Sequence, residues 1–254
     1  MAQVKISVIN ASTVLKDEQI KPVVKALQTQ VSRDFYPVWG VDVDLDFVPS
    51  KQDPPAGHWL LAVLDNSDQA EALGYHDMTA DGLPLGKVFA GTDLQFRSQW
   101  SVTASHELLE MLGDPAINLT ALTMTAFTVD QNVVGRLYAY EVCDACEADP
   151  DGYEIDGVLV SDFVYPEWFE SFRQTGSAQF DFRQRITDPF QLLPGGYASI
   201  FDITSCMGWQ QIMRPMPAPR NAPAAHRAPV GSRRERRRTP RNQWMNSTAH
   251  SGGR

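Results

Sequence analysis

The stretch SVTASHELLEMLGDP at residues 101–115 decides the fold expected for this chain. Its leucines and Val102 recur at helical spacing, which predicts one apolar side of a helix that ends at Gly113. His106 and Glu110 stand four residues apart, so their side chains project from the same helical face and could hold one ion together. The Asp-Pro pair that follows predicts the end of this helix, because a residue before proline disfavours helical geometry.

The residues before this helix predict strands and a second helix. Alternating apolar residues indicate half-buried strands at residues 4–8 and 41–47, and the continuous apolar run at residues 59–64 indicates a fully buried strand. Between the first two strands, apolar spacings of three and four predict an amphipathic helix over residues 17–35. Pro22 is compatible with that helix because it falls near the first turn, where its missing N–H costs little.

The segments on either side of the motif complete the expected fold. Residues 74–90 are loop-rich and contain Pro84, so we expect any strand there at a sheet edge, where a peptide strand could pair with it. Downstream, residues 137–142 and 153–164 predict strands and residues 166–172 predict a short helix. The prediction is an α+β fold with a mixed sheet packed against the N-terminal helix and the motif helix.

Charge divides the chain into two segments. The 254 residues carry a net charge of −9, but residues 214–254 contain ten arginines and a single acidic residue, for +9, and residues 1–213 carry −18. The second segment also holds six prolines and few large apolar residues, so it cannot bury enough surface to order itself. We expect one α+β domain over residues 1–213 and a disordered tail over residues 214–254.

The chain has only three cysteines, a small and odd number that argues against a disulfide framework. This favours a reducing compartment. The N-terminus alternates polar and apolar residues, unlike a signal peptide, and no apolar run approaches the roughly 20 residues that span a bilayer. These features predict a protein of the cytoplasm or the interior of a virion, with no membrane partner.

The motif at residues 106–110 resembles the HExxH motif of the zincin metallopeptidases, with Glu110 at the second ligand position. The resemblance covers this motif and the order of elements over roughly residues 1–115, and it implies a zincin-like fold. It also implies a metal-dependent peptidase or amide hydrolase that acts on peptides or proteins. In that scheme His106 and Glu110 bind zinc, and Glu107 is the general base toward water on the metal.

The third ligand is less clearly specified by the resemblance. In the metzincin branch it would fall at Ala116, which cannot bind metal. In the gluzincin branch a glutamate on a following element serves, and Glu141 is expected in that role with Asp144 supporting it, although their spacing is one residue short. Asp114 and Asp144 remain alternatives to Glu141.

The ligand set affects both reactivity and metal identity. One imidazole and two carboxylates would leave a zinc site formally neutral, which weakens the activation of water. The same ligands suit manganese or calcium. Two other readings therefore stand beside the hydrolase: a catalytically silent structural or interaction protein with a stabilising metal, and a helix whose His and Glu residues bind nothing.

Several stretches are also similar to uncharacterised bacterial and phage-encoded proteins, a resemblance that supplies a setting but no activity. They are the motif helix and the segments Tyr140–Asp144, Val160–Val164 and Pro194–Tyr197.

Cys143 and Cys146 form a Cys-x-x-Cys pair that invites comparison with the zinc deaminases. The deaminase signature separates its His and Glu by one residue, whereas His106 and Glu107 are adjacent, and Val142 stands where the signature has proline. A redox role is also disfavoured, because Asp144 between the cysteines opposes thiolate formation. We expect buried, inactive thiols.

The tail generates a first testable prediction. Removing residues 214–254 should leave the thermal unfolding transition nearly unchanged, because a Pro- and Arg-rich segment buries little surface. The full chain should bind polyanions weakly through the tail and with a steep salt dependence, and the −18 body should not bind them. A melting temperature lowered by several degrees in the truncated protein would show instead that the tail packs on the body.

Overall fold

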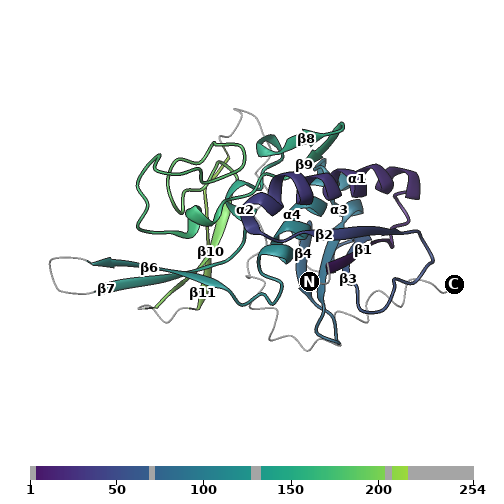
Figure 1. Ribbon diagram of the computed structural model, residues 1–254, viewed down its shortest axis with the longest axis horizontal. Helices are drawn as coiled ribbons and strands as arrows, with labels where there is room; N and C mark the ends of the chain where they lie inside the picture. The colour runs from purple at the N-terminus through teal and green to yellow at the C-terminus, as the bar shows by residue number, and fades with distance from the viewer. Residues whose placement is uncertain (1–3, 69–71, 127–132, 204–207, 217–254) are drawn as a thin grey trace.

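The computed structural model combines a five-stranded mixed sheet with a four-stranded and a two-stranded antiparallel sheet (Figure 1). None of the helices in the described part of the chain has the length and apolar composition needed to cross a lipid bilayer. From residue 217 onward the predicted tail lies outside the described residues. The structure describes residues 4–68, 72–126, 133–203 and 208–216.

The five-stranded sheet has the order β2-β1-β3-β5-β4. Its strands are β1 (Val4–Asn10), β2 (Val43–Val48), β3 (Trp59–Leu64), β4 (Gly74–Met78) and β5 (Pro84–Phe89). All neighbouring pairs are parallel except β4 and β5, which are antiparallel. The strands predicted at residues 4–8 and 59–64 are confirmed, and β2 begins two residues later than the predicted 41–47.

Two predictions about this sheet need correction. The strand β3 is not fully buried: Leu61 and Val63 are buried, but the other four residues of the strand are only partly buried, because the helices pack on the face to which Leu61 and Val63 point. The edge position predicted for strands within residues 74–90 is confirmed for β4 and wrong for β5, which lies between β3 and β4 and has all six of its residues buried. Pro84 is tolerated there because it is the first residue of the strand.

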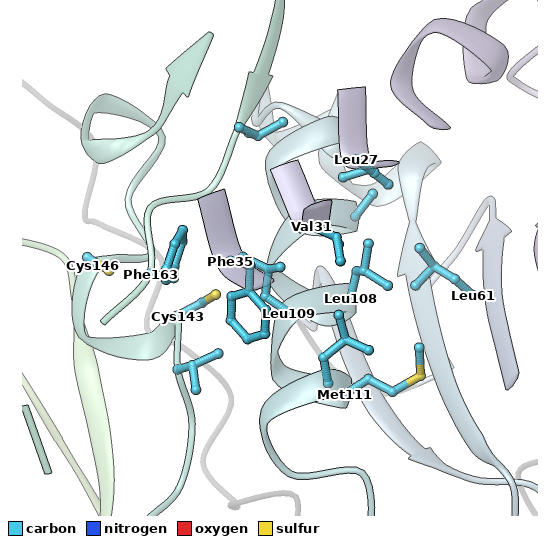
Figure 2. Packing of buried hydrophobic residues seen from close by; sticks show 14 of the residues in the cluster. Leu27, Val31, Phe35, Leu61, Leu108, Leu109, Met111, Cys143, Cys146 and Phe163 are labelled. Carbon is cyan, nitrogen blue, oxygen red and sulfur yellow. The ribbon is translucent and has the colours of Figure 1, made fainter. Parts of the chain in front are cut away.

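The predicted N-terminal helix is present and longer than expected. Helix α1 (Asp17–Thr29) continues as the π-helical segment η1 (Gln30–Phe35) and as α2 (Tyr36–Trp39). Pro22 is its sixth residue, in the second turn and not the first, so one backbone hydrogen bond is forgone. Leu27, Val31 and Phe35 line the inner side of this helix and pack toward the motif helix (Figure 2).

The motif helix α4 (Trp100–Gly113) follows the short helix α3 (Ala90–Phe96) and has the predicted length. Its residues from 101 to 112, other than Thr103, are all buried, because the sheet, α1 and the downstream chain surround it. Burying a hydroxyl requires a hydrogen-bond partner. Ser105 Oγ donates to Gln30 Oε1 at 2.6 Å and accepts the N–H of Ser161 at 3.0 Å, while Gln30 Nε2 donates to the carbonyl of Ser161 at 2.9 Å. This closed triangle joins α4, η1 and the downstream chain.

The downstream chain forms the two antiparallel sheets. The first has the order β11-β10-β7-β6, and its β6–β7 hairpin projects away from the five-stranded sheet (Figure 1). The strands are β6 (Thr120–Ala126), β7 (Val133–Ala139), β10 (Tyr197–Asp202), β11 (Trp209–Met213), β8 (Tyr153–Ile155) and β9 (Val158–Val160).

Three downstream predictions need correction. The strand predicted at residues 153–164 is the β8–β9 hairpin, whose turn residues Asp156 and Gly157 have φ of 51° and 79°. An Asp-Gly pair is a strong hairpin signal, and the prediction of one strand followed the apolar residues on either side of the pair instead. The strand predicted at 137–142 is β7, which ends at Ala139, and the helix predicted at 166–172 is a 3-10 turn, η4 (Pro166–Phe169).

Arg214 belongs with the folded body. Its N–H donates to the carbonyl of Gly196 at 2.9 Å, and its carbonyl accepts the N–H of Gly195 at 2.7 Å. A truncation that removes only the tail should therefore end the chain after Met216.

A buried carboxyl group in the downstream core generates a prediction about stability. Asp162 is fully buried, and its Oδ1 accepts the N–H groups of Phe163 at 2.8 Å and Arg183 at 3.2 Å. Burial, followed by the nearby carboxylate of Asp181, raises the pKa of Asp162 to about 9. The folded protein therefore holds this proton between about pH 4 and pH 9, whereas the unfolded chain releases it.

The stability that this proton contributes is full below about pH 4 and is lost as the pH rises toward 9, by up to roughly 1.4 kcal/mol per pH unit. Asp162→Asn keeps an oxygen for the two backbone donors and cannot ionise. We expect chemical denaturation to show a stability advantage for this variant that grows from pH 5 to pH 8. If the free energy of unfolding changed with pH in the same way for the variant and the wild type, Asp162 would not be a buried neutral carboxyl group.

Candidate metal centre

Helix α4 carries three titratable side chains into the interior. The exposed fractions of the His106, Glu107 and Glu110 side chains are 9%, 4% and 0%. Their helical spacing was visible in the sequence, but their burial follows from the packing of α4 on all sides. A buried ionised group is costly unless another charge or a metal compensates it.

The edge strand β4 adds a histidine from the sheet. His76 lies opposite Gly86 in the β4–β5 register, and its side chain is fully buried. His76 Nδ1 lies 3.6 Å from Glu110 Oε2 and 3.8 Å from Glu107 Oε2. The imidazole of His76 therefore meets α4 from the side of the sheet.

A glycine makes room for Glu107 beneath the sheet. A Cβ atom on Gly74 would lie 2.8 Å from both Cγ and Oε1 of Glu107, so the absence of a side chain there allows β4 to approach α4 this closely. A Cβ atom on Gly86 would lie 2.6 Å from a methyl group of Leu61, so this glycine instead makes room for a side chain of the neighbouring strand β3.

The segment after β7 supplies further carboxylates. Asp144, which begins the 3-10 turn η2 (Asp144–Cys146), places Oδ1 3.2 Å from His106 Nε2. The same nitrogen lies 3.1 Å from Glu110 Oε1. Glu141, in the irregular chain just before η2, is also buried and groups with His76 and Glu110.

These side chains form three groups whose donor atoms lie within 4.8 Å of one another. Donors at 2.0–2.1 Å from a tetrahedral zinc ion are separated by about 3.3 Å. The measured separations of 3.1, 3.2 and 3.6 Å between imidazole nitrogens and carboxylate oxygens are therefore of the size that a bound ion requires. The groups are His76, Glu110 and Glu141; His106, Glu107 and Glu110; and His106, Asp144 and Glu147.

The electrostatics of His106 show how strongly this cluster attracts positive charge. Burial lowers the pKa of His106, but Glu110, Asp144 and Glu107 outweigh it and raise the pKa well above its ordinary value. An excess of carboxylates that favours an imidazolium ion also favours a divalent cation. A metal ligand must be deprotonated, so the binding of a cation at His106 releases a proton.

Comparison of the chain with protein-family models, with curated proteins and with solved structures finds no match. The comparisons therefore assign no family. The observation that stands is a set of buried His and Glu clusters that could hold a metal ion.

The predicted site residues are brought together in part. Glu110 lies beside His106 and Glu107, as the helical spacing required, and Asp144 also reaches His106. Glu141 joins Glu110, but in the group that contains His76 and not in a group with His106. The alternative ligand Asp114 instead accepts the N–H groups of residues 118 and 119, at 3.0 and 2.8 Å.

Sequence reasoning missed His76 and Glu147. Residues 74–90 were expected to be an edge segment, and nothing in the sequence around His76, which stands between Tyr75 and Asp77, marks it as a ligand. Glu147 follows the Cys-x-x-Cys pair and reaches His106 because the 3-10 turn η2 folds the chain back. No helical or strand spacing relates either residue to His106.

Cys143 and Cys146 are buried in the apolar core near Phe163 (Figure 2). Burial raises the pKa of both thiols well above the ordinary value. Neither cysteine enters any of the three donor groups found in the described part of the chain. The expectation of buried thiols is confirmed, and the geometry gives the deaminase alternative no support.

The sharing of Glu110 between two groups generates a prediction about metal retention. Glu110→Ala and His106→Ala should each weaken zinc binding by at least about 100-fold, more than His76→Ala, because Glu110 and His106 each lie in two of the three groups and His76 lies in one. Glu107→Ala should retain most of the metal, because a general base contacts water and not the ion. Elemental analysis of purified full-length variants measures this order.

Two exposed or peripheral positions serve as matched controls. Glu18→Ala on α1 and His58→Ala, whose Nδ1 pairs with Ser7, lie outside all three groups and should retain wild-type metal content. Loss of metal from Glu107→Ala with full retention in Glu110→Ala would reverse the assigned roles.

Proposed function

We propose that this protein is a metal-dependent hydrolase of peptide or amide bonds, with a zincin-like arrangement and Glu107 as its general base. The observation that carries the proposal is the position of Glu107, whose carboxylate lies among the imidazole and carboxylate donors of His106, Glu110 and His76. Zinc suits this mixture of imidazole and carboxylate ligands, and manganese fits it as well.

A bound divalent cation would supply Lewis-acid polarisation of a substrate carbonyl and of the attacking water. The residues of the chain provide the remaining functions. Glu107 takes the proton from the water, and Glu110 and His106 hold the cation from adjacent turns of α4. The packing of Glu107 beneath Gly74 fixes the direction of its carboxylate, so the base is positioned before substrate arrives.

The sheet supports an extended peptide as the substrate. The strand β4 is one of the two edge strands of the five-stranded sheet and places His76 beside Glu110. An edge strand aligns an extended peptide by main-chain hydrogen bonds, which would bring successive carbonyl groups past the cation. The side chain of His106 is 9% exposed, whereas those of Glu110 and His76 are fully buried.

A second candidate function is a structural metal site in an interaction protein. It is favoured by burial, because the His76 and Glu110 side chains are 0% exposed and Asp144 is 4% exposed. Structural sites are closed by protein ligands, whereas catalytic sites keep a position for water or substrate. A polyanion contact through the arginine-rich tail would be independent of either function.

The variant Glu107→Gln separates the two functions. If the centre is catalytic, hydrolysis of a peptide library by the zinc- or manganese-loaded protein should fall by roughly 100-fold or more, because the amide cannot accept the proton. Metal content and melting temperature should stay close to those of the wild type, since glutamine preserves the shape of the side chain. Both are measured on the same preparations as turnover.

The exposed substitution Glu18→Gln on α1 is the matched control and should leave turnover unchanged. Equal turnover in wild type and Glu107→Gln would remove Glu107 from the mechanism. A wild-type protein that binds metal but cleaves no peptide with zinc, manganese or calcium supplied would establish the structural function instead.

A further inference from the structure

We propose that the centre binds two divalent cations, bridged by the carboxylate of Glu110. The inference rests on the metal binding of the proposed function and adds a second ion, with His76 as one of its ligands. It follows from the orientation of Glu110, whose two oxygens face different histidines: Oε1 lies 3.1 Å from His106 Nε2, and Oε2 lies 3.6 Å from His76 Nδ1.

The three donor groups divide into two sets around Glu110. None of them contains both histidines, so within the described part of the chain no compact set of donors for a single ion uses both imidazoles. One set consists of His76, Glu110 and Glu141. The other surrounds His106, which groups with Glu107 and Glu110 and also with Asp144 and Glu147. Each set offers an imidazole and at least two carboxylates, which is enough to hold one cation.

Charge compensation favours two ions over one. The three groups contain five different carboxylic acids and two histidines. With neutral imidazoles, as metal ligation requires, the five carboxylates carry −5, so one divalent cation leaves −3 and two leave −1. Concentrated negative charge that is buried away from water is destabilising, and a second cation would neutralise most of the charge that remains after the first has bound.

The spacing also fits a bridged pair. Ions in two-metal sites lie about 3.5–4 Å apart, a separation that one carboxylate spans with an oxygen on each ion. Glu110 is fully buried on α4, with His76 of β4 3.6 Å from its Oε2, while Asp144 of η2 lies 3.2 Å from His106. The helix would thus hold the bridge, and β4 and the chain after β7 would supply the terminal ligands.

Stoichiometry tests the proposal on the full-length protein. Metal-free protein titrated with Zn²⁺ should bind two equivalents by calorimetry and by elemental analysis after gel filtration. His76→Ala should bind one equivalent, and the control His58→Ala should bind two. Saturation of the wild type at one equivalent, or two equivalents in His76→Ala, would overturn the second site.

A spectroscopic measurement on the wild type does not depend on the folding of any variant. Two Mn²⁺ ions that share a carboxylate couple magnetically, so protein loaded with two equivalents of Mn²⁺ should give the electron paramagnetic resonance spectrum of a coupled pair. One equivalent, or the spectrum of isolated ions at two equivalents, contradicts the Glu110 bridge.

The outcomes also separate this inference from the proposed function. A coupled pair in a protein that cleaves no peptide keeps the two-ion site and removes the hydrolase. A single bound ion with Glu107-dependent cleavage keeps the hydrolase and removes the second ion. Failure to bind Zn²⁺ or Mn²⁺ at all removes both.

Discussion

The structure depends on the burial of helix α4 along nearly its whole length. A helix surrounded by a sheet, a second helix and the downstream chain would ordinarily be apolar on every side. Helix α4 instead carries His106, Glu107 and Glu110 into this interior. The apolar contacts of Leu108 and Leu109 with the α1 side hold the helix in place, and the cost of burying its charged residues must be met by their surroundings.

The surroundings meet that cost in two different ways. On the α1 side, Ser105 and Gln30 are satisfied by hydrogen bonds that also fix how α4 is rotated about its axis. On the opposite side, carboxylates outnumber imidazoles, and hydrogen bonds among carboxylates do not remove a net charge. A bound cation would complete the second side in the way that Gln30 completes the first. The rotation set by Ser105 therefore directs Glu110 toward the candidate ligands on β4 and after β7.

The fold was predictable where a local pattern decided the outcome. The helix at 17–35 and the motif helix have periodic apolar residues, the strand at 59–64 is a continuous apolar run, and each formed within a few residues of its predicted bounds. Predictions failed where long-range packing decided the position or the burial of a strand. The interior place of β5 depends on β4 folding back outside it, and the half-exposure of β3 depends on which sheet face the helices cover. Neither arrangement leaves a local signal.

The same division applies to the candidate site. The sequence by itself determined the pairing of His106 with Glu110 and the adjacent position of Glu107, because helical geometry brings residues four apart to one face. Only the tertiary structure decided that His76, thirty residues before His106, faces the same glutamate. It also decided that Glu141 groups with His76, whereas Asp144 lies beside His106. These contacts depend on strand register and on the path of a loop, which are set by the packing of the whole domain and not by spacing along the chain.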